Sequence, residues 1–412
     1  MTTNLHGPLA RYAARLHGSV GDKHHVASPL GAWLLLALCG SAVPDAGGLA
    51  DALGTDPATA ARTAAALLDA PHPLAPAATA VWHRPDADTD ALAAWRATLP
   101  RATETGPLPD QAGLDAWARR HSAGLLDRFP LTVSPHVVLA LASAVATRIS
   151  WADPFGLAPA AALGPDSPWA GRLTRVLRTP AYGHQAWISA TPEAGDVAVH
   201  TAAAEPGGGN GDGAGLLVVS VAAAPGVAPA DVLAAAYRVA ADADADEPTG
   251  RRSLFDLPLG ATPLWTLREE TVRTHARDRR EERHSAALPC WSARAEHDLT
   301  GPGLGFSALA RVLAPLVGGI EVEARQAVVA RYSRYGFEAA AVTGAFGVVS
   351  LPPEGLARTA ELRFGHPYAV VAVATDRRGG GVGPWHGVPV FSGWVAEPDD
   401  VPGTEFADPP LA

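Results

Sequence analysis

Histidine and carboxylate side chains are the groups in this chain that could carry out catalysis. The 412 residues include 15 histidines, yet none falls in a zinc-binding spacing such as HExxH. Asp153, Glu338 and Glu361 are isolated carboxylates with no visible acid–base partner. No GxSxG or GxGxxG motif occurs, and the glycine-rich run at 207–215 lacks the ending of a phosphate loop. We therefore expect no catalytic residue, no metal ion and no cofactor.

Residues 335–351 (YGFEAAAVTGAFGVVSL) could act in another way, by adding a strand to a β-sheet. With the two-residue period of a strand, Phe337, Ala339, Ala341 and Thr343 share one face. After Phe337 that face carries only small or β-branched residues, as a strand that enters between two others requires. The glycines and the Leu-Pro-Pro-Glu-Gly that follows favour an exposed loop instead. The segment could therefore be an exposed loop that can also enter a sheet as a strand. The alternative is that it is only a flexible surface loop.

Strands are expected on both sides of this segment. Residues 322–334 alternate apolar and polar side chains up to Gly336, and residues 361–376 and 388–398 read as the two strands of a closing hairpin. The order is strand, glycine, Glu-Ala-Ala-Ala hinge, loop, and a strand pair that opens with RFGHPY at 363–368. This order resembles the C-terminal part of the serpins, a family of serine protease inhibitors.

Two earlier stretches carry the same resemblance. Ser28 and Pro29 are typical of the N-cap and first turn of a helix, and the Ser-Pro start resembles a serpin pattern. Residues 136–156 predict a long strand that resembles the serpin strand ending in a spaced Trp and Phe. Trp151 has the matching spacing, and Ser143 replaces the family's Asn. The resemblance runs from about residue 5 to residue 398.

The resemblance implies one α+β domain over residues 1–412. We expect a large central antiparallel sheet, two smaller sheets, about eight or nine helices, and an exposed reactive-centre loop at about 337–360. The last residues, 399–412, are expected to form a flexible tail. Helices are predicted from apolar periodicity at 5–18, 57–70, 87–98, 111–129, 229–240 and 306–317. Many Ala, Gly, Pro and Arg and very few Lys indicate a bacterial, actinobacterial-like member.

The resemblance also implies a suicide mechanism. A serine protease cuts the exposed loop, and the freed loop enters the main sheet, framed by 137–151 and 322–334, and traps the acyl-enzyme. In the family the cleaved bond lies a fixed distance after the hinge glycine. Counting fourteen residues on from Gly336 reaches Ser350. We therefore predict cleavage between Ser350 and Leu351, with an uncertainty of one residue either way. Small side chains before the bond suit an elastase-, subtilisin- or chymotrypsin-like protease as partner.

Two sets of residues are expected to control loop insertion. The hinge comprises Gly336, Phe337, Glu338, Ala339, Ala340, Ala341, Val342 and Thr343. The sheet-opening region comprises Ser28, Ser143, Gln326, Trp151, Arg334 and Cys290. Gln326 replaces the usual His and can hydrogen-bond both serines, while Arg334 and Cys290 occupy positions where the family commonly pairs Glu with Lys.

Phe337 counts against efficient inhibition, because the family usually has Thr or Ser there. Forcing an aromatic ring between two strands costs about 1–3 kcal/mol. The alternative function is therefore a non-inhibitory serpin-fold protein, used for binding or recruited as a biosynthetic enzyme.

Composition limits the remaining possibilities. A formal charge of −10 argues against a nucleic-acid partner, and the mixed charge run at 268–283 predicts a solvated face. No secretory signal is seen, and the apolar run at 33–38 is too short to span a membrane. We expect a soluble cytoplasmic monomer, with secretion as the alternative if an export signal has been removed. Cys39 and Cys290 are either buried thiols or one disulfide.

Overall fold

The computed structural model describes residues 5–42, 47–134, 136–147, 149–205, 213–317, 323–336 and 354–406. Eight α-helices lie in these ranges: α1 His6–Val20, α2 Pro29–Leu38, α3 Gly47–Leu53, α4 Pro57–Asp69, α5 Asp90–Arg96, α6 Gln111–His121, α7 Pro229–Ala240 and α8 Phe306–Val317. The α+β class is confirmed, and every helix predicted from periodicity is present. Within these ranges, no helix has the length and apolar character needed to cross a bilayer.

Hydrogen bonding divides the strands into four sheets. A fully antiparallel six-stranded sheet has the order β1 His25–Ala27, β17 Val388–Val395, β16 Tyr368–Asp376, β9 Ala214–Ala222, β8 Gly195–Ala203 and β7 His184–Thr191. A mixed six-stranded sheet has the order β10 Gly260–Ala261, β11 Trp265–Arg273, β15 Glu354–Arg363, β12 Arg280–Leu288, β6 Arg175–Arg178 and β5 Gly156–Pro159. β13 Trp291–Asp298 pairs with β14 Arg325–Tyr332, and β3 Thr103–Pro107, β2 Ala77–His83 and β4 Leu139–Val145 form the last sheet.

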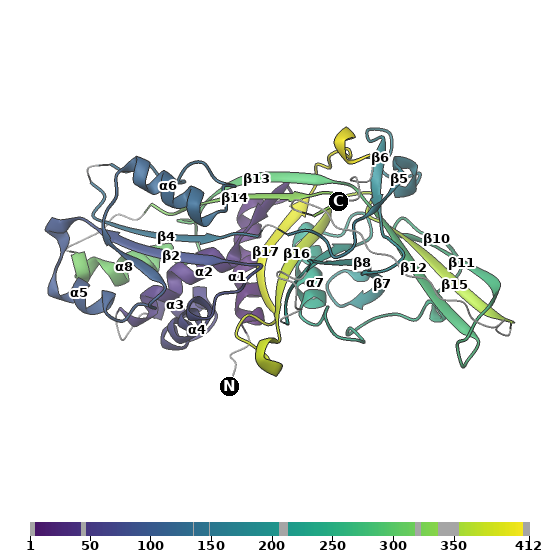
Figure 1. Cartoon of the computed structure of the whole chain (residues 1–412), viewed down its shortest axis with the longest axis horizontal. Coiled ribbons are helices and arrows are strands. Elements are labelled where there is room, and N and C mark those ends of the chain that lie inside the picture. The colour runs from purple at the N-terminus through teal and green to yellow at the C-terminus, as the bar shows by residue number, and fades with distance from the viewer. Residues whose placement is uncertain are drawn as a thin grey trace.

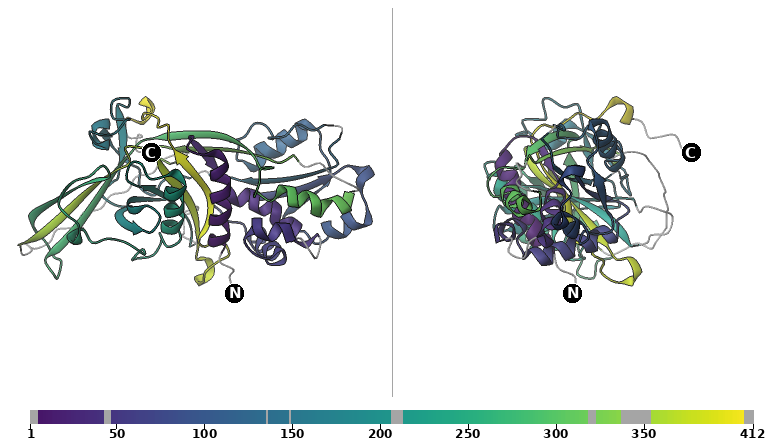
Figure 2. Two further views of the ribbon diagram at one scale, coloured as in Figure 1. Left: turned by 180° about the vertical axis from the view of Figure 1, so that it is seen from behind. Right: turned by 90° about the vertical axis from the view of Figure 1, so that its left-hand side faces the viewer.

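The sheets and helices form an elongated molecule (Figure 1). Strands β11, β12 and β15 extend as a ribbon at one end, while α3, α4, α5 and α8 gather at the other. The view from behind in Figure 2 shows α1 crossing the middle of the molecule beside β16 and β17.

Local sequence signals explain where several helices begin and end. The Ser28 hydroxyl accepts a hydrogen bond from the Gly31 amide, so Ser28 is the N-cap of α2 and Pro29 its first residue, as predicted. α6 ends at His121, earlier than the predicted 129, because Ala123 has a left-handed φ of 53° that no α-helix accommodates.

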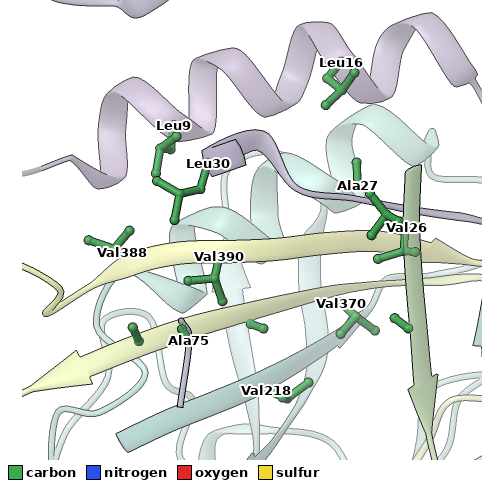
Figure 3. Close-up of a cluster of buried hydrophobic side chains, with 14 of the residues drawn as sticks. Leu9, Leu16, Val26, Ala27, Leu30, Ala75, Val218, Val370, Val388 and Val390 are labelled. Carbon is green, nitrogen blue, oxygen red and sulfur yellow. The ribbon is translucent and has the colours of Figure 1, made fainter. Parts of the chain in front are cut away.

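Helix α2 lies inside the hydrophobic core. All ten residues of this helix are buried, as expected for a helix that is apolar on every side. Figure 3 shows Leu9 of α1 near Leu30, Val388 and Val390, and Leu16 farther along α1, on the side of Ala27 and Val26. Burial of such side chains contributes roughly 1.5–3 kcal/mol each, so this layer holds α1 and α2 against the antiparallel sheet.

Three predictions about strands and the loop need correction. The reactive-centre loop does not extend to residue 360, because residues 354–360 lie in β15, hydrogen-bonded to β11 on one side and β12 on the other. The strand predicted at 361–376 is two strands in different sheets, divided after Arg363. The strand predicted at 136–156 is shorter: β4 ends at Val145, and Ser150 and Trp151 form only isolated bridges.

Candidate functional site

Strands β4 and β14 are the edges of two separate sheets, and a cavity of about 330 Å³ lies between them. Leu141 and Ser143 of β4 and Gln326 and Val328 of β14 line its two walls. In the described residues no β-ladder joins the two strands. We call this cavity the slot. The prediction of one large sheet framed by these segments is corrected to two sheet edges that face each other.

The slot is covered on both faces by apolar side chains. Trp117 of α6 and Phe129 lie on one face, and Val370 of β16 and Phe391 of β17 lie on the other. Trp117 meets Trp82 of β2 edge to face, with ring centroids 5.4 Å apart, which fixes α6 over the three-stranded sheet. The slot is therefore a largely apolar space, and the edges of β4 and β14 form two of its walls.

Both walls are tied to the first turn of α2. The Ser143 hydroxyl donates to the Gly31 carbonyl at 2.7 Å from the β4 side. From the β14 side, the Gln326 amide accepts from the Ser28 backbone N–H at 3.0 Å and donates to the Ser28 carbonyl at 2.8 Å. A Cβ atom at Gly31 would lie 3.3–3.5 Å from Ser28 Oγ, Ser143 Oγ and Gln326 Nε2, so all three predicted residues meet around this glycine.

The Ser28 hydroxyl, however, does not bind Gln326. It donates instead to the Val390 carbonyl at 2.9 Å. Of the two serines that Gln326 was expected to bind, Gln326 therefore binds Ser28, through its backbone, while the Ser143 hydroxyl donates to Gly31.

Beyond the ends of β4 and β14, Ser150 and Gly336 form an isolated bridge, and Trp151 binds the same turn. The indole N–H of Trp151 donates to the Ser333 carbonyl at 2.9 Å, and its backbone N–H donates to the Tyr335 carbonyl at 3.2 Å. Gly336 has φ of 109°, and a Cβ there would lie 2.4 Å from the Ile149 carbonyl oxygen. Only glycine fits this position, so the chain leaves the slot through a constrained turn.

Comparison with known proteins identifies the fold. No family model and no curated protein matches the sequence. The structure of the thermophilic serpin Tengpin in its native state is similar, with a TM-score of 0.60 and 12% identity over 96% of this chain and 95% of that chain. The chain has the serpin fold. Human thyroxine-binding globulin with bound thyroxine (TM-score 0.58, 14% identity, 96% and 98% coverage) and Arabidopsis AtSerpin1 (0.59, 13%, 97% and 100%) are similar as well.

The serpin fold was predicted from sequence and is confirmed, whereas the loop itself stays a prediction. The hinge residues 337–343 and the proposed cleavage residues Ser350 and Leu351 lie outside the described residues. The single-domain assignment and the bacterial origin also stay predictions. In the described ranges, no group of three His, Cys, Asp or Glu side chains could hold a metal ion.

Arg334 and Cys290 share one end of the serpin fold but are held separately. The Arg334 guanidinium donates to the Phe155 carbonyl at 2.9 Å and to the Glu405 carbonyl at 2.8 Å. The Cys290 carbonyl accepts from the Asp399 N–H at 2.8 Å, and burial raises the pKa of its thiol. Cys290 is a buried free thiol, as is Cys39.

Residues 399–406, predicted as part of a flexible tail, anchor this end instead. Glu405 accepts hydrogen bonds from the Arg334 backbone N–H at 3.1 Å and from Arg331 at 3.0 Å. The Asp400 carboxylate accepts from two backbone N–H groups, those of Thr174 and Arg175. Burial alone would raise the pKa of Asp400, but these hydrogen bonds outweigh it and lower the pKa. The anchoring role of Glu405 and Asp400 was not predicted from the sequence. The acidic residues after position 398 were the only hint that this segment could bind basic or N–H groups.

Proposed function

We propose that this protein is a suicide inhibitor of an elastase- or subtilisin-like serine protease. The observation that carries the proposal is the slot, where two strand edges face each other across an apolar cavity and one of these strands, β14, leads directly to Gly336. An edge strand presents a row of N–H and C=O groups that a further strand can pair with. The segment that follows Gly336 in sequence is the nearest source of such a strand.

The side chains of that segment match the space. A strand between β4 and β14 would point alternate residues toward α6 and toward the antiparallel sheet. Apolar side chains already cover both faces of the slot, so an entering strand needs small side chains. Small side chains are present at Ala339, Ala341 and Thr343. Loop entry would first require the Trp151–Ser333 and Ser150–Gly336 contacts to part.

The proposed chemistry is interrupted peptide hydrolysis. The protease serine attacks the carbonyl carbon of Ser350, the bond to Leu351 breaks, and the amine leaves with Leu351 as it takes up a proton. An ester then joins the protease serine to Ser350. Entry of the freed segment into the slot displaces the protease, whose distorted triad and oxyanion hole no longer hydrolyse the ester.

The position of Arg358 favours this class of target over trypsin-like enzymes. Arg358 lies in β15, where its guanidinium donates to Glu269 at 2.8 Å and to the carbonyls of Leu254 and Leu257. A bond within a doubly paired strand does not fit a protease cleft, so cleavage after an arginine is not expected near the loop.

A ligand-binding role without inhibition is the second candidate. Phe337 would obstruct strand entry, and a cavity of about 330 Å³ falls in the size range of small-molecule sites. Thyroxine-binding globulin, a structure of similar fold, holds thyroxine. In this alternative, which includes recruitment as a biosynthetic enzyme, the cavity would hold a small apolar molecule.

A protease panel separates the two candidates. We would incubate the protein with elastase, subtilisin, chymotrypsin and trypsin, and look for SDS-resistant complexes by gel and for the cut by mass spectrometry. Inhibition predicts a covalent complex and a cut between residues 349 and 352. Cleavage without any complex, together with an unchanged Tm of the cleaved protein, would overturn the proposal and favour ligand binding.

A further inference from the structure

Five buried polar side chains meet between the antiparallel six-stranded sheet and the β13–β14 pair. His200, Ser220 and Tyr368 come from β8, β9 and β16, and Trp291 and Tyr332 come from β13 and β14. His200 lies opposite Ser220 in the ladder, and the Trp291 and Tyr332 rings stack with centroids 5.8 Å apart. All five are buried, and His200, Ser220, Tyr332 and Tyr368 have no exposed surface. We call this group the polar seam.

One polar atom of each side chain lacks a hydrogen bond from any described residue. These atoms are His200 Nδ1, Ser220 Oγ, Tyr332 Oη, Tyr368 Oη and Trp291 Nε1. Burial raises the pKa of Tyr332 and Tyr368, and a weak hydrogen-bond-like interaction with Ser220 and Trp291, respectively, partly offsets that rise, but neither pair has the geometry of a full hydrogen bond. Buried polar atoms are almost always paired, and five unpaired ones in one place call for a partner.

Neighbouring groups determine whether His200 Nδ1 can donate or accept a hydrogen bond to a bound molecule. The Asp153 carbonyl can only accept, so His184 Nε2 donates to it at 2.7 Å. Burial lowers the pKa of His184 and His200, so both rings are neutral near pH 7. The lone pair of His184 is then on Nδ1, where it accepts from His200 Nε2 at 3.1 Å. His200 Nδ1 therefore carries a lone pair and can only accept.

These roles specify the chemistry of the guest. Trp291 Nε1 can only donate, His200 Nδ1 can only accept, and the three hydroxyls can do either. A fully deprotonated anion cannot donate to His200, and a metal cation cannot accept from Trp291. A neutral molecule with both functions satisfies the whole set, and burial between two sheets favours the smallest one.

We propose that the polar seam is an internal hydration site in which ordered water molecules bridge the antiparallel sheet to the β13–β14 pair. Each water has two to four polar partners available, which is the usual number for buried water. The site goes beyond the proposed inhibition and stands whichever function the slot has. Because β14 is also a wall of the slot, the waters would let β14 shift against the sheet by exchanging partners, without leaving bare polar groups.

Two isosteric variants test the proposal by stability. Tyr332→Phe and Tyr368→Phe each remove one hydroxyl and keep the ring, and Tyr182→Phe is the matched control because Tyr182 is 83% exposed. Bridging water predicts that each seam variant lowers Tm by about 2 °C or more while the control does not. Tyr332→Phe combined with Ser220→Ala should cost less than the sum of the two single changes, because they share a water. An unchanged or raised Tm in both seam variants would mean that the tyrosine hydroxyls have no bound water, and would overturn the proposal.

A crystal structure of the full chain tests the site directly. We expect solvent peaks within hydrogen-bonding distance of both His200 Nδ1 and Tyr332 Oη, and loss or displacement of a peak in Tyr332→Phe. A crystal soaked in bromide should show no anomalous peak in the seam. Direct hydrogen bonds among the five side chains, or a bromide peak among them, would each overturn the proposal.

Discussion

The Nδ1–H of His17 donates a hydrogen bond to Nε2 of His25 across 2.7 Å. The direction follows from the far end, where His25 Nδ1 can only donate to the Lys23 carbonyl at 2.7 Å. At the near end, Tyr237 donates to Ser392, whose hydroxyl donates to His17 Nε2 at 2.7 Å. The chain of hydrogen bonds from α7 through β17 and α1 to β1 is therefore complete only while both histidines are neutral.

Stability should fall at acid pH because of His17. Burial, with smaller contributions from His25 and His297, lowers the pKa of His17 from 6.5 to about 3. The unfolded chain binds a proton below pH 6.5 and the folded chain does not, so stability is highest above pH 6.5 and is lost as the pH falls toward 3. The loss from His17 alone is on the order of 2 kcal/mol between pH 6.5 and pH 5. Tm measured from pH 8 to pH 4 reports it.

A pair of variants assigns that pH dependence. His17→Gln removes one titrating group and should make the fall in Tm between pH 6.5 and pH 5 smaller, while other buried histidines with lowered pKa values keep part of the slope. His136→Gln replaces an exposed histidine and should leave the slope as it was. An equal slope in the wild type and His17→Gln would contradict the assignment.

The side chain of Phe337 should decide how often a protease escapes. We expect Phe337→Thr to raise the fraction of SDS-resistant complex relative to cleaved product, because a small first residue enters the slot more readily. The stoichiometry of inhibition with subtilisin measures this partition. Val382→Thr, at an apolar position that is 58% exposed, is the control. No change in the partition would show that the ring is not the obstacle.

Gln326 should hold the β14 wall of the slot to α2. Gln326→Ala removes both hydrogen bonds to the Ser28 backbone, and we expect a loss of about 1–3 kcal/mol, because a buried N–H and C=O lose their partners. Thermal or urea unfolding measures the loss. Gln185→Ala changes an exposed residue and should be nearly neutral, and an equal effect of the two variants would contradict the role given to Gln326.

Gly336 should not tolerate any side chain. Gly336→Ala places a methyl group 2.4 Å from the Ile149 carbonyl at a φ of 109°, so we expect a lower Tm and faster proteolysis near Trp151. Gly18→Ala is the control, because it lies in α1 with open space around its Cβ position. Alanine there should be neutral or stabilising. A wild-type Tm for Gly336→Ala would mean that the turn is looser than the structure shows.

Local signals explain what the sequence could predict. Ser28 caps α2 and Pro29 is its first residue, α7 begins at Pro229 as predicted, and α8 has the bounds predicted from apolar periodicity. The grouping of Ser28, Ser143 and Gln326 was anticipated through the serpin resemblance, whereas their meeting around Gly31 is seen only in the structure.

Long-range pairing accounts for what was missed. Glu405 binds Arg334 across 71 positions of the chain, and no local pattern indicates that contact. The same holds for β11, which pairs with β15 although 89 positions separate Glu269 from Arg358. The early end of α6 coincides with two successive residues of positive φ, Ala123 and Gly124, and Gly124 was the local signal that the prediction to residue 129 passed over.

The interior position of β15 has a practical consequence for a nicked molecule. After a cut anywhere in residues 337–353, the C-terminal fragment would still supply β15, β16 and β17, each hydrogen-bonded to strands of the N-terminal fragment. The two polypeptides would migrate together on gel filtration and separate only in denaturant. A native size measurement alone would therefore report intact protein long after every loop had been cut.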